Sequence, residues 1–397
     1  MLVIVSDLHM TDRDTGAPVT DTELEAFVRE VGTLEPQNEK LKVLLLGDII
    51  DFLRSEQWEE LWKKENGATP WSGLGRDFEG FADSLQEQRL QTIAEGVEKR
   101  YSAFAKALKT LKKNRDTEIH YVAGNHDFML QLSPLVRARI VNLLSLDEDP
   151  NKPFPLEYED RALSVYAEHG NRYDKTNWHQ ARAGLWAIGD AIVLRVVNQF
   201  GALARAELHL TDRTPLGRAV QEIDNVEPDI HIPLYIAWLG QTKLVSGAER
   251  RKLVNCWRET VSSFLSLEEF REDRYGDLST AIRWLRRLYQ IADLDGMLGH
   301  LKKVPAEIGV NYALRAYLVK TEAQIRVFGH THKPGVHALP EVGGQRRHYL
   351  NTGAWRRVIT RLNVEGERLD FAGHRVATYL VIWKPGEFSL LSRCQIP

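Results

Sequence analysis

The sequence predicts an α/β fold in which a layered core is interrupted by a large helical insertion. Short, continuous apolar runs, which are typical of strands buried on both faces, recur up to about Gly170 and return after residue 322. Charged runs with helical spacing alternate with the first of these strands, as in an α/β core. Between the two parts the chain is rich in Arg, Leu, Ala and Glu, with apolar residues at three- and four-residue intervals.

The predicted strands are apolar runs that end abruptly in polar residues. The clearest are Leu2–Val5 (LVIV) and Val43–Leu46 (VLLL). His120–Ala123 (HYVA) and Leu163–Ala167 (LSVYA) resemble them less cleanly. The strands predicted after the inserted region are Ile325–Phe328, His348–Asn351 and Thr378–Trp383.

Helical spacing is found in one charged region of the first part and in the inserted region. The charged region runs from Phe81 to Leu111, and the Gly- and Pro-containing NGATPWSGLG before it predicts a loop. Residues 249–270 and 279–301 predict helices, with RTPLG and IDNVEPDIHIP as breaks. We therefore expect three segments, namely core residues 1–174, a helical insertion at 175–321 and core residues 322–397.

Composition and charge place the chain among ordinary globular proteins. It has 397 residues, 43% of them hydrophobic, and can bury a sizeable core. Its 52 Lys and Arg residues against 55 Asp and Glu residues give a net charge of −3, which does not support nucleic acid as a stable partner. Cys256 and Cys394 are too few for a disulfide framework, and the N-terminal MLVIVSDLH lacks the basic region of a signal peptide. We therefore expect a cytoplasmic protein.

The most apolar stretch of the chain is Leu185–Leu208. Asp190, Arg195 and Arg205 interrupt it, so it falls short of the roughly 20 apolar residues that a membrane-spanning helix needs. It predicts a buried or amphipathic helix, and contact with a membrane surface is the alternative.

Polar residues of a few kinds follow five of the predicted strands. SDLH follows LVIV, GDIID follows VLLL, GNHD follows HYVA, HG follows SVYAE and GHTH follows IRVF. Ligands of α/β sheets bind outside the carboxyl ends of the strands, so we expect the five clusters to converge. Their polar side chains are Asp7, His9, Asp48, Asp51, Asn125, His126, Asp127, His169, His330 and His332.

These residue types suit divalent metal ions, because imidazole, carboxylate and amide groups occur together without thiolate. The spacing in Asp7–Leu8–His9 and in His330–Thr331–His332 places both side chains of each pair on one side if the chain is locally extended. Two metal ions about 3.5–4 Å apart are well served by a bridging carboxylate, and Asp48 after a glycine is the natural bridge. The alternative is five unrelated turns.

Together the blocks DxH, GDxxD, GNHD, HG and GHTH, in this order, resemble the calcineurin-like metallophosphoesterases. The matched blocks lie within Leu2–Gly170 and Glu322–Trp355. The resemblance implies two packed mixed sheets flanked by helices. It also implies two divalent metal ions, for which Mn²⁺ is the expected metal and Fe, Zn or Ni are the alternatives. It implies Asp7, His9 and His332 as ligands of the first ion, Asn125, His169 and His330 as ligands of the second, and Asp48 as a bridge between them.

The resemblance also implies roles in catalysis. His126 would not bind metal but would stabilise or protonate the leaving oxygen, and Asp51 would hydrogen-bond the His126 ring. A metal-bound hydroxide would attack phosphorus in line. Asp127 would be structural, at a cap or a turn.

The substrate class is narrowed by departures from known branches of the superfamily. Phe52 and Leu53 follow GDxxD where the protein serine/threonine phosphatases have Arg-Gly, which argues against a phosphoprotein. The pattern looks closer to the branch of the UDP-2,3-diacylglucosamine pyrophosphatases, which usually has arginine where His126 stands. We expect hydrolysis of a phosphodiester or pyrophosphate bond in a small molecule. The alternative functions are a phosphomonoesterase acting on small metabolites, a membrane-surface nucleotide-lipid pyrophosphatase and a non-catalytic scaffold. The sequence does not indicate the oligomeric state.

The insertion enters between His169 and His330, so its ends should lie near the metal ions, where it could form a lid or a substrate pocket. Arg172 and Lys175 lead into it, and Lys333 follows GHTH. We predict that these three cations bind substrate phosphate; ordinary solvated charges are the alternative.

Overall fold

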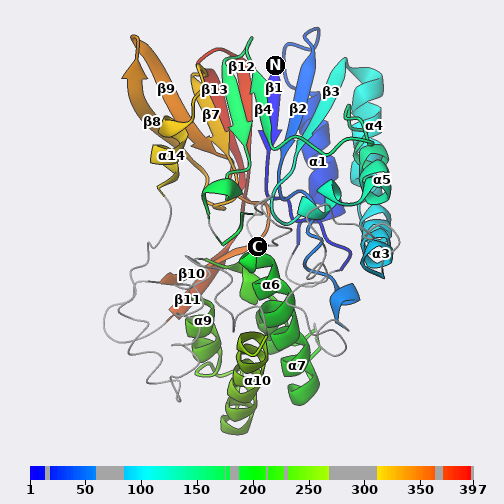
Figure 1. Cartoon of the computed structure of the whole chain (residues 1–397), viewed down its shortest axis with the longest axis vertical. Coiled ribbons are helices and arrows are strands. Elements are labelled where there is room, and N and C mark those ends of the chain that lie inside the picture. Colours follow the sequence, from blue (N-terminus) through cyan, green and yellow to red (C-terminus); the bar gives the residue numbers. More distant parts are fainter. Residues whose placement is uncertain are drawn as a thin grey trace.

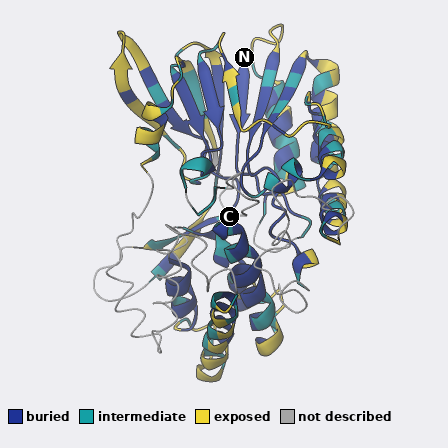
Figure 2. Ribbon diagram, viewed as in Figure 1, coloured by how far each residue is buried: buried dark blue, intermediate teal, exposed yellow. Residues whose placement is uncertain are grey.

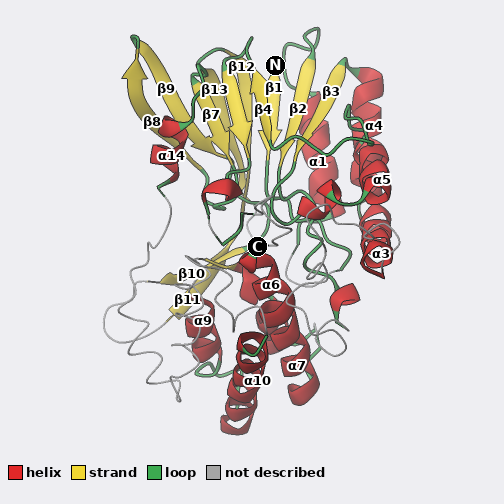
Figure 3. Cartoon of the chain, viewed as in Figure 1, coloured by secondary structure: helices red, strands yellow, loops and turns green. Residues whose placement is uncertain are grey.

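The protein has a mixed α/β fold, as predicted, with helices around packed sheets and a helical insertion (Figures 1 and 3). The computed structural model describes residues 1–13, 18–59, 85–174, 176–178, 187–211, 213–227, 231–267, 311–362 and 370–394. The two large sheets occupy the upper part of Figure 1, and the inserted helices lie below them.

The first sheet has five strands in the order β13-β12-β1-β2-β3. Its strands are β1 (Leu2–Val5), β2 (Leu41–Leu46), β3 (Thr117–Val122), β12 (Val376–Lys384) and β13 (Glu387–Cys394). β1, β2 and β3 are parallel, and β12 is antiparallel to both β1 and β13. Val5 pairs with Leu45, and Leu45 with Tyr121, so the three parallel strands end at one edge.

The second sheet also has five strands, in the order β4-β5-β7-β9-β8. Its strands are β4 (Glu157–Asp160), β5 (Val165–Glu168), β7 (Ile325–Phe328), β8 (Gly335–Val342) and β9 (Gln345–Asn351). β5, β7 and β9 are parallel, and Glu168 pairs with Phe328, which pairs with Asn351. Every strand predicted from the sequence is present in one of these two sheets.

An aliphatic layer between the two sheets explains the uninterrupted apolar runs. Alternate residues of β1 and β2 face this layer, while Val3, Val5, Val43 and Leu45 pack on the other face of the sheet, against helices. Both faces of the central strands are therefore buried (Figure 2). The layer consists of Leu2, Ile4, Leu44, Leu46, Val122, Val165, Ala167, Ile325, Val327, Leu350, Leu380 and Ile382.

Helices cover the outer faces of the sheets. Those beside the first sheet are α1 (Asp21–Gly32), α3 (Leu85–Arg100), α4 (Ser102–Asn114) and α5 (Pro134–Leu144), and α14 (Tyr312–Leu318) packs on the second. Thr20 and Glu23 form a capping box at the start of α1. The charged region predicted as helical forms α3 and α4, although residues 81–84 lie outside the described residues.

The inserted region is mostly helical where the structure describes it. Besides α14, which packs on the second sheet, its helices are α6 (Ile188–Ile192), the π-helical η4 (Val193–Val197), α7 (Asn198–Leu208), α8 (Pro215–Gln221), α9 (Ile232–Leu239) and α10 (Gly247–Leu265). The helix predicted at 249–270 corresponds to α10, whereas the one predicted at 279–301 lies outside the described residues. RTPLG contains the start of α8, with Thr214 as its N-cap.

A small third sheet joins the inserted region to the second part of the core. β6 (Val226–Glu227) pairs in parallel with β10 (Val358–Leu362), which pairs with β11 (Asp370–His374). Two residues are too few to show the period of a strand, which is why no strand is predicted at β6. Short turns complete the fold, namely η1 (Glu56–Trp58), η2 (Phe128–Gln131), η3 (Asn171–Tyr173) and η5 (Ile223–Asn225).

The described part of the apolar stretch, residues 187–208, is a largely buried helical segment, which confirms the prediction for these residues. From residue 188 onward it forms α6, η4 and α7 in succession. Ile188, Leu194 and Phe200 are fully buried in the core. None of the helices in the described ranges combines the length and the apolar character that crossing a membrane requires.

Candidate metal centre

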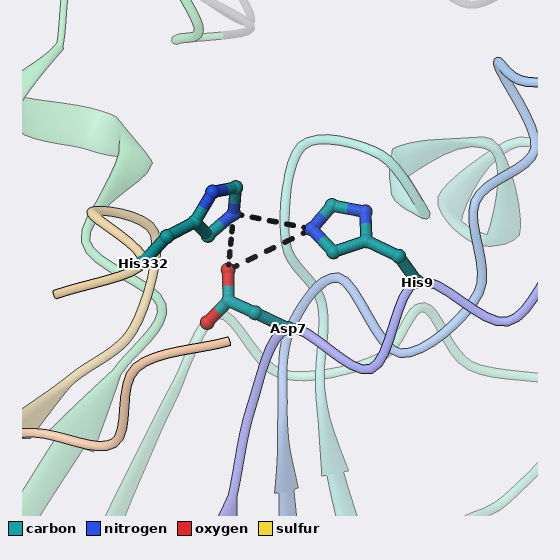
Figure 4. Close-up of side chains that lie close together, drawn as sticks. All are labelled: Asp7, His9 and His332. Atoms are coloured by element: carbon teal, nitrogen blue, oxygen red, sulfur yellow. Dashed lines mark hydrogen bonds and ion pairs between the residues drawn. The ribbon is translucent and has the colours of Figure 1, made fainter. Parts of the chain in front are cut away.

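The predicted ligands converge in loops directly after the parallel strands. Asp7 and His9 follow β1, and His332 comes from the loop after β7 (Figure 4). His332 Nε2 lies 3.3 Å from Asp7 Oδ1 and 3.2 Å from His9 Nε2, and His9 Nε2 lies 4.0 Å from Asp7 Oδ1. Three donor atoms from two distant parts of the chain thus face one another.

A second group forms next to the first. His169 Nε2 lies 3.1 Å from Asp48 Oδ2, and Asp48, His169 and His330 each offer one donor atom within 4.8 Å of the others. His169 Nδ1 lies 3.2 Å from the Leu46 carbonyl, so its Nε2 is the atom that faces Asp48. The His330 backbone N–H donates to Asp7 at 3.2 Å, which ties the two groups together.

The donor set fits divalent cations. Asn125 Oδ1 is buried and accepts no hydrogen bond in the described structure, and such an orphaned oxygen is costly unless a cation binds it. The facing nitrogens of His9 and His332 would both have lone pairs to offer in the neutral rings. Carboxylate, imidazole and amide donors suit manganese, iron or zinc.

Five candidate ligands adopt the left-handed backbone conformation. The two pairs are therefore not locally extended, which was the condition for placing both side chains of each pair on one side, because the chain turns as soon as the strand ends. Such φ values are uncommon outside glycine and persist where the surroundings fix them, as at functional sites. Here the Asp7 and His9 N–H groups donate to the Gly47 and Asp48 carbonyls at 3.0 and 2.9 Å. The φ values are 51° at Asp7, 48° at His9, 52° at Asp48, 67° at His330 and 56° at His332.

Glycines before the ligands allow close approach of the loops. A Cβ at Gly124 would overlap the Asp48 carboxylate and lie 2.5 Å from the Asp48 nitrogen, and one at Gly47 would overlap the His169 ring. Gly47 also has a φ of +74°, which side chains rarely adopt. The glycine of GD and that of GNHD therefore serve the packing of the site itself.

Asp127 holds two of these loops together. Its carboxylate accepts hydrogen bonds from the Ile49 N–H at 3.0 Å, the Gly124 N–H at 2.6 Å and the Tyr121 hydroxyl at 2.6 Å. It thereby fixes the loop after β2 against the loop after β3. These hydrogen bonds agree with the predicted structural role, although Asp127 makes no side-chain capping bond.

Replacing Asp127 with alanine should lower the free energy of unfolding by about 2–4 kcal/mol, because one hydroxyl and two N–H groups lose their buried acceptor. Urea unfolding in EDTA measures this without a contribution from bound metal. Asp116→Ala, at an exposed position, is the control and should change stability by less than about 0.5 kcal/mol. Equal stability of the two variants would contradict the structural role of Asp127.

Asp51 lies between two histidines. Its Oδ1 is 3.0 Å from His126 Nδ1, and its Oδ2 is 3.2 Å from His9 Nδ1. The first contact is the one that the sequence predicts. The second places the same carboxylate behind a candidate metal ligand, a role that the spacing of GDxxD did not reveal.

The buried charged groups of the centre strongly shift one another's pKa values. Burial alone would raise the pKa of Asp48, but His169 and His126 lower it well below its usual range. Burial lowers the pKa of His126, but Asp51 and Asp48 outweigh it and raise that pKa to about 10. Burial and then Arg356 lower the pKa of His9 to about 4. The carboxylates of Asp48 and Asp51 and the His126 ring thus stabilise one another's charged forms.

A cavity of about 790 Å³ opens onto the centre, a size typical of small-molecule sites. Asp48, Asn125 and His126 line it on the core side. Ile192 and Val193 of the inserted region line it as well, so the insertion reaches the candidate metal centre.

The predicted substrate-binding cations have different surroundings. Lys333 lines the cavity. The guanidinium of Arg172 forms an ion pair with Glu168 and a 2.8 Å hydrogen bond to the Tyr166 hydroxyl, and Arg172 does not line the cavity. Lys175 lies outside the described residues.

Three residues near the centre were missed. Glu227 lies 2.9 Å from His332 Nδ1, Asp174 lies 3.2 Å from His330 Nε2, and Arg356 lines the cavity. Asp174 follows the HG motif closely in sequence, so its proximity to the candidate metal centre could have been predicted from that position. Nothing in the sequence places Glu227 there, because its position depends on the pairing of β6 with β10.

No protein-family model matches this sequence, and neither does any curated protein. Function therefore has to be inferred from the chemistry of the site, since a fold alone does not specify it.

Proposed function

We propose that this protein is a metal-dependent phosphoesterase of the calcineurin-like metallophosphoesterase superfamily. It hydrolyses a phosphodiester or pyrophosphate bond in a small molecule and uses two divalent metal ions. Mn²⁺ is the metal that we expect at both sites. The observation that supports this most is the convergence of imidazole, carboxylate and amide donors from five strand ends beside a cavity of about 790 Å³. The low cysteine content supports a cytoplasmic location as part of the same proposal.

Two sets of residues would hold the ions, with Asp48 shared between them. When bound, such ions activate water for attack on phosphorus and offset the negative charge of the ester oxygens. The first set is Asp7, His9 and His332, and the second is Asn125, His169 and His330.

His126 provides the proton for the leaving oxygen, and Asp51 supports His126 in this role. His126 lines the cavity next to Asp48 and Asn125, and its Nδ1 lies 3.0 Å from Asp51. Nε2 is therefore the atom that can donate to a leaving oxygen in the cavity, while Asp51 fixes the ring and stabilises its charge. Lys333 is placed to attract the anionic substrate.

The test is hydrolysis of bis(4-nitrophenyl) phosphate and 4-nitrophenyl phosphate after chelation and re-addition of Mn²⁺. We expect metal-dependent cleavage with a faster rate on the diester. A faster rate on the monoester would favour a phosphatase of small metabolites. Failure to cleave these esters or a nucleoside diphosphate sugar, at any Mn²⁺ concentration, would contradict the proposed function.

A further inference from the structure

Two carboxylates outside the predicted ligand set each face one of the candidate ligands. Glu227 Oε1 lies 2.9 Å from His332 Nδ1, and Asp174 Oδ2 lies 3.2 Å from His330 Nε2. The two histidines belong to different donor groups of the centre. Asp174 precedes the inserted region directly, whereas Glu227 lies within it.

The position of Glu227 is fixed by core segments. In the parallel pairing of β6 with β10, Glu227 lies opposite Thr360. The Arg356 guanidinium lies 4.0 Å from Glu227 Oε1 and donates to the Asp224 carbonyl at 3.0 Å. Backbone pairing and a neighbouring cation thus hold the carboxylate against the His332 ring.

We propose that Glu227 is a positioning residue that orients His332 toward the metal ion held with Asp7 and His9. An ionised carboxylate only accepts hydrogen bonds, so the Nδ1 facing Glu227 carries the hydrogen and Nε2 keeps its lone pair. That Nε2 is the atom 3.3 Å from Asp7 Oδ1 and 3.2 Å from His9 Nε2. A carboxylate behind a metal-binding histidine fixes the ring and raises its basicity.

The inserted region then completes one metal site and does more than cover the cavity. Asp174 faces Nε2 of His330, which belongs to the other donor group, so the two carboxylates contact ligands of different sites. This inference rests on the proposed metal centre and deepens it. It predicts that neutralising each carboxylate weakens one site and spares the other.

The test uses the full chain with Asn125→Ala and His169→Ala, which remove two ligands of the second site and leave the Asp7–His9–His332 site intact. Isothermal titration with Mn²⁺ measures the affinity of this remaining site. Adding Glu227→Gln should weaken it by about 10- to 100-fold, as loss of a carboxylate behind a metal-binding histidine typically does. Glu227→Asp, which keeps the charge, should recover part of the affinity. Asp174→Asn should leave it unchanged, as should Glu341→Gln at an exposed position of β8.

The outcomes separate the inference from the proposal beneath it. Wild-type protein that binds no Mn²⁺ would overturn both. Wild-type binding with unchanged affinity in Glu227→Gln, or with equal losses in Glu227→Gln and Asp174→Asn, would overturn the positioning role alone. Thermal unfolding in EDTA shows whether each variant is folded. If Glu227→Gln does not fold, Glu227→Asp still allows the test to be made.

Discussion

Asp48→Asn should abolish hydrolysis and reduce metal retention while the chain stays folded. The carboxylate lies at the meeting point of the donor groups, 3.1 Å from His169 Nε2. It also accepts a 2.8 Å hydrogen bond from the backbone N–H of His126. An amide supplies one neutral oxygen in place of an anionic carboxylate that can bridge two cations. We expect turnover to fall at least about a thousandfold, which corresponds to roughly 4 kcal/mol of lost transition-state stabilisation.

The matched control is Asp160→Asn. Asp160 is also buried, but it lies away from the centre and forms a 2.7 Å ion pair with Lys42. Its metal content and turnover should equal those of the wild type. Metal analysis of dialysed protein and Mn²⁺-dependent ester hydrolysis measure both quantities. If Asp48→Asn kept full activity after chelation and re-addition of metal, the assignment of Asp48 would be wrong.

His126→Ala should slow turnover by about 10²- to 10⁴-fold, the usual contribution of a general acid. The metal content should not change, because the side chain of His126 faces Asp51 and the cavity without belonging to the proposed ligand set. His120→Ala is the control, since His120 is a half-buried histidine paired with Glu148. Loss of metal from His126→Ala would contradict its non-ligand role.

Asp51→Asn should behave differently from His126→Ala. Asp51 contacts His9 as well as His126, so its loss should reduce both turnover and Mn²⁺ affinity. Titration with Mn²⁺ and assay at saturating Mn²⁺ separate the two effects. A variant with unchanged Mn²⁺ affinity would show that the contact with His9 has no effect on the metal site.

The fold and most of the candidate site could be predicted from local sequence. LVIV and VLLL are apolar throughout because both faces of β1 and β2 are buried, and a polar residue directly after such a run marks the strand end. Since β1, β2 and β3 are parallel and in register, their ends meet at one edge. Asp7, Asp48 and Asn125 could therefore be brought together without a structure.

The remaining features depend on long-range contacts. Asp7 is left-handed because its N–H is held by the Gly47 carbonyl of a neighbouring loop, which its own neighbours in sequence do not indicate. Glu227 meets His332 only because β6 pairs with β10, more than 130 residues further along the chain. Arg172, which its position in the sequence suggested as a phosphate ligand, forms an ion pair with Glu168, four residues earlier, and does not line the cavity.

The central claim is that the strand ends hold two metal ions per chain. Equilibrium dialysis of the wild-type protein against Mn²⁺, followed by elemental analysis, tests it most directly. We expect two Mn²⁺ ions per chain at saturation, and fewer in Asp48→Asn. Saturation at one ion or none, with the chain folded, would contradict a two-metal centre built from these residues.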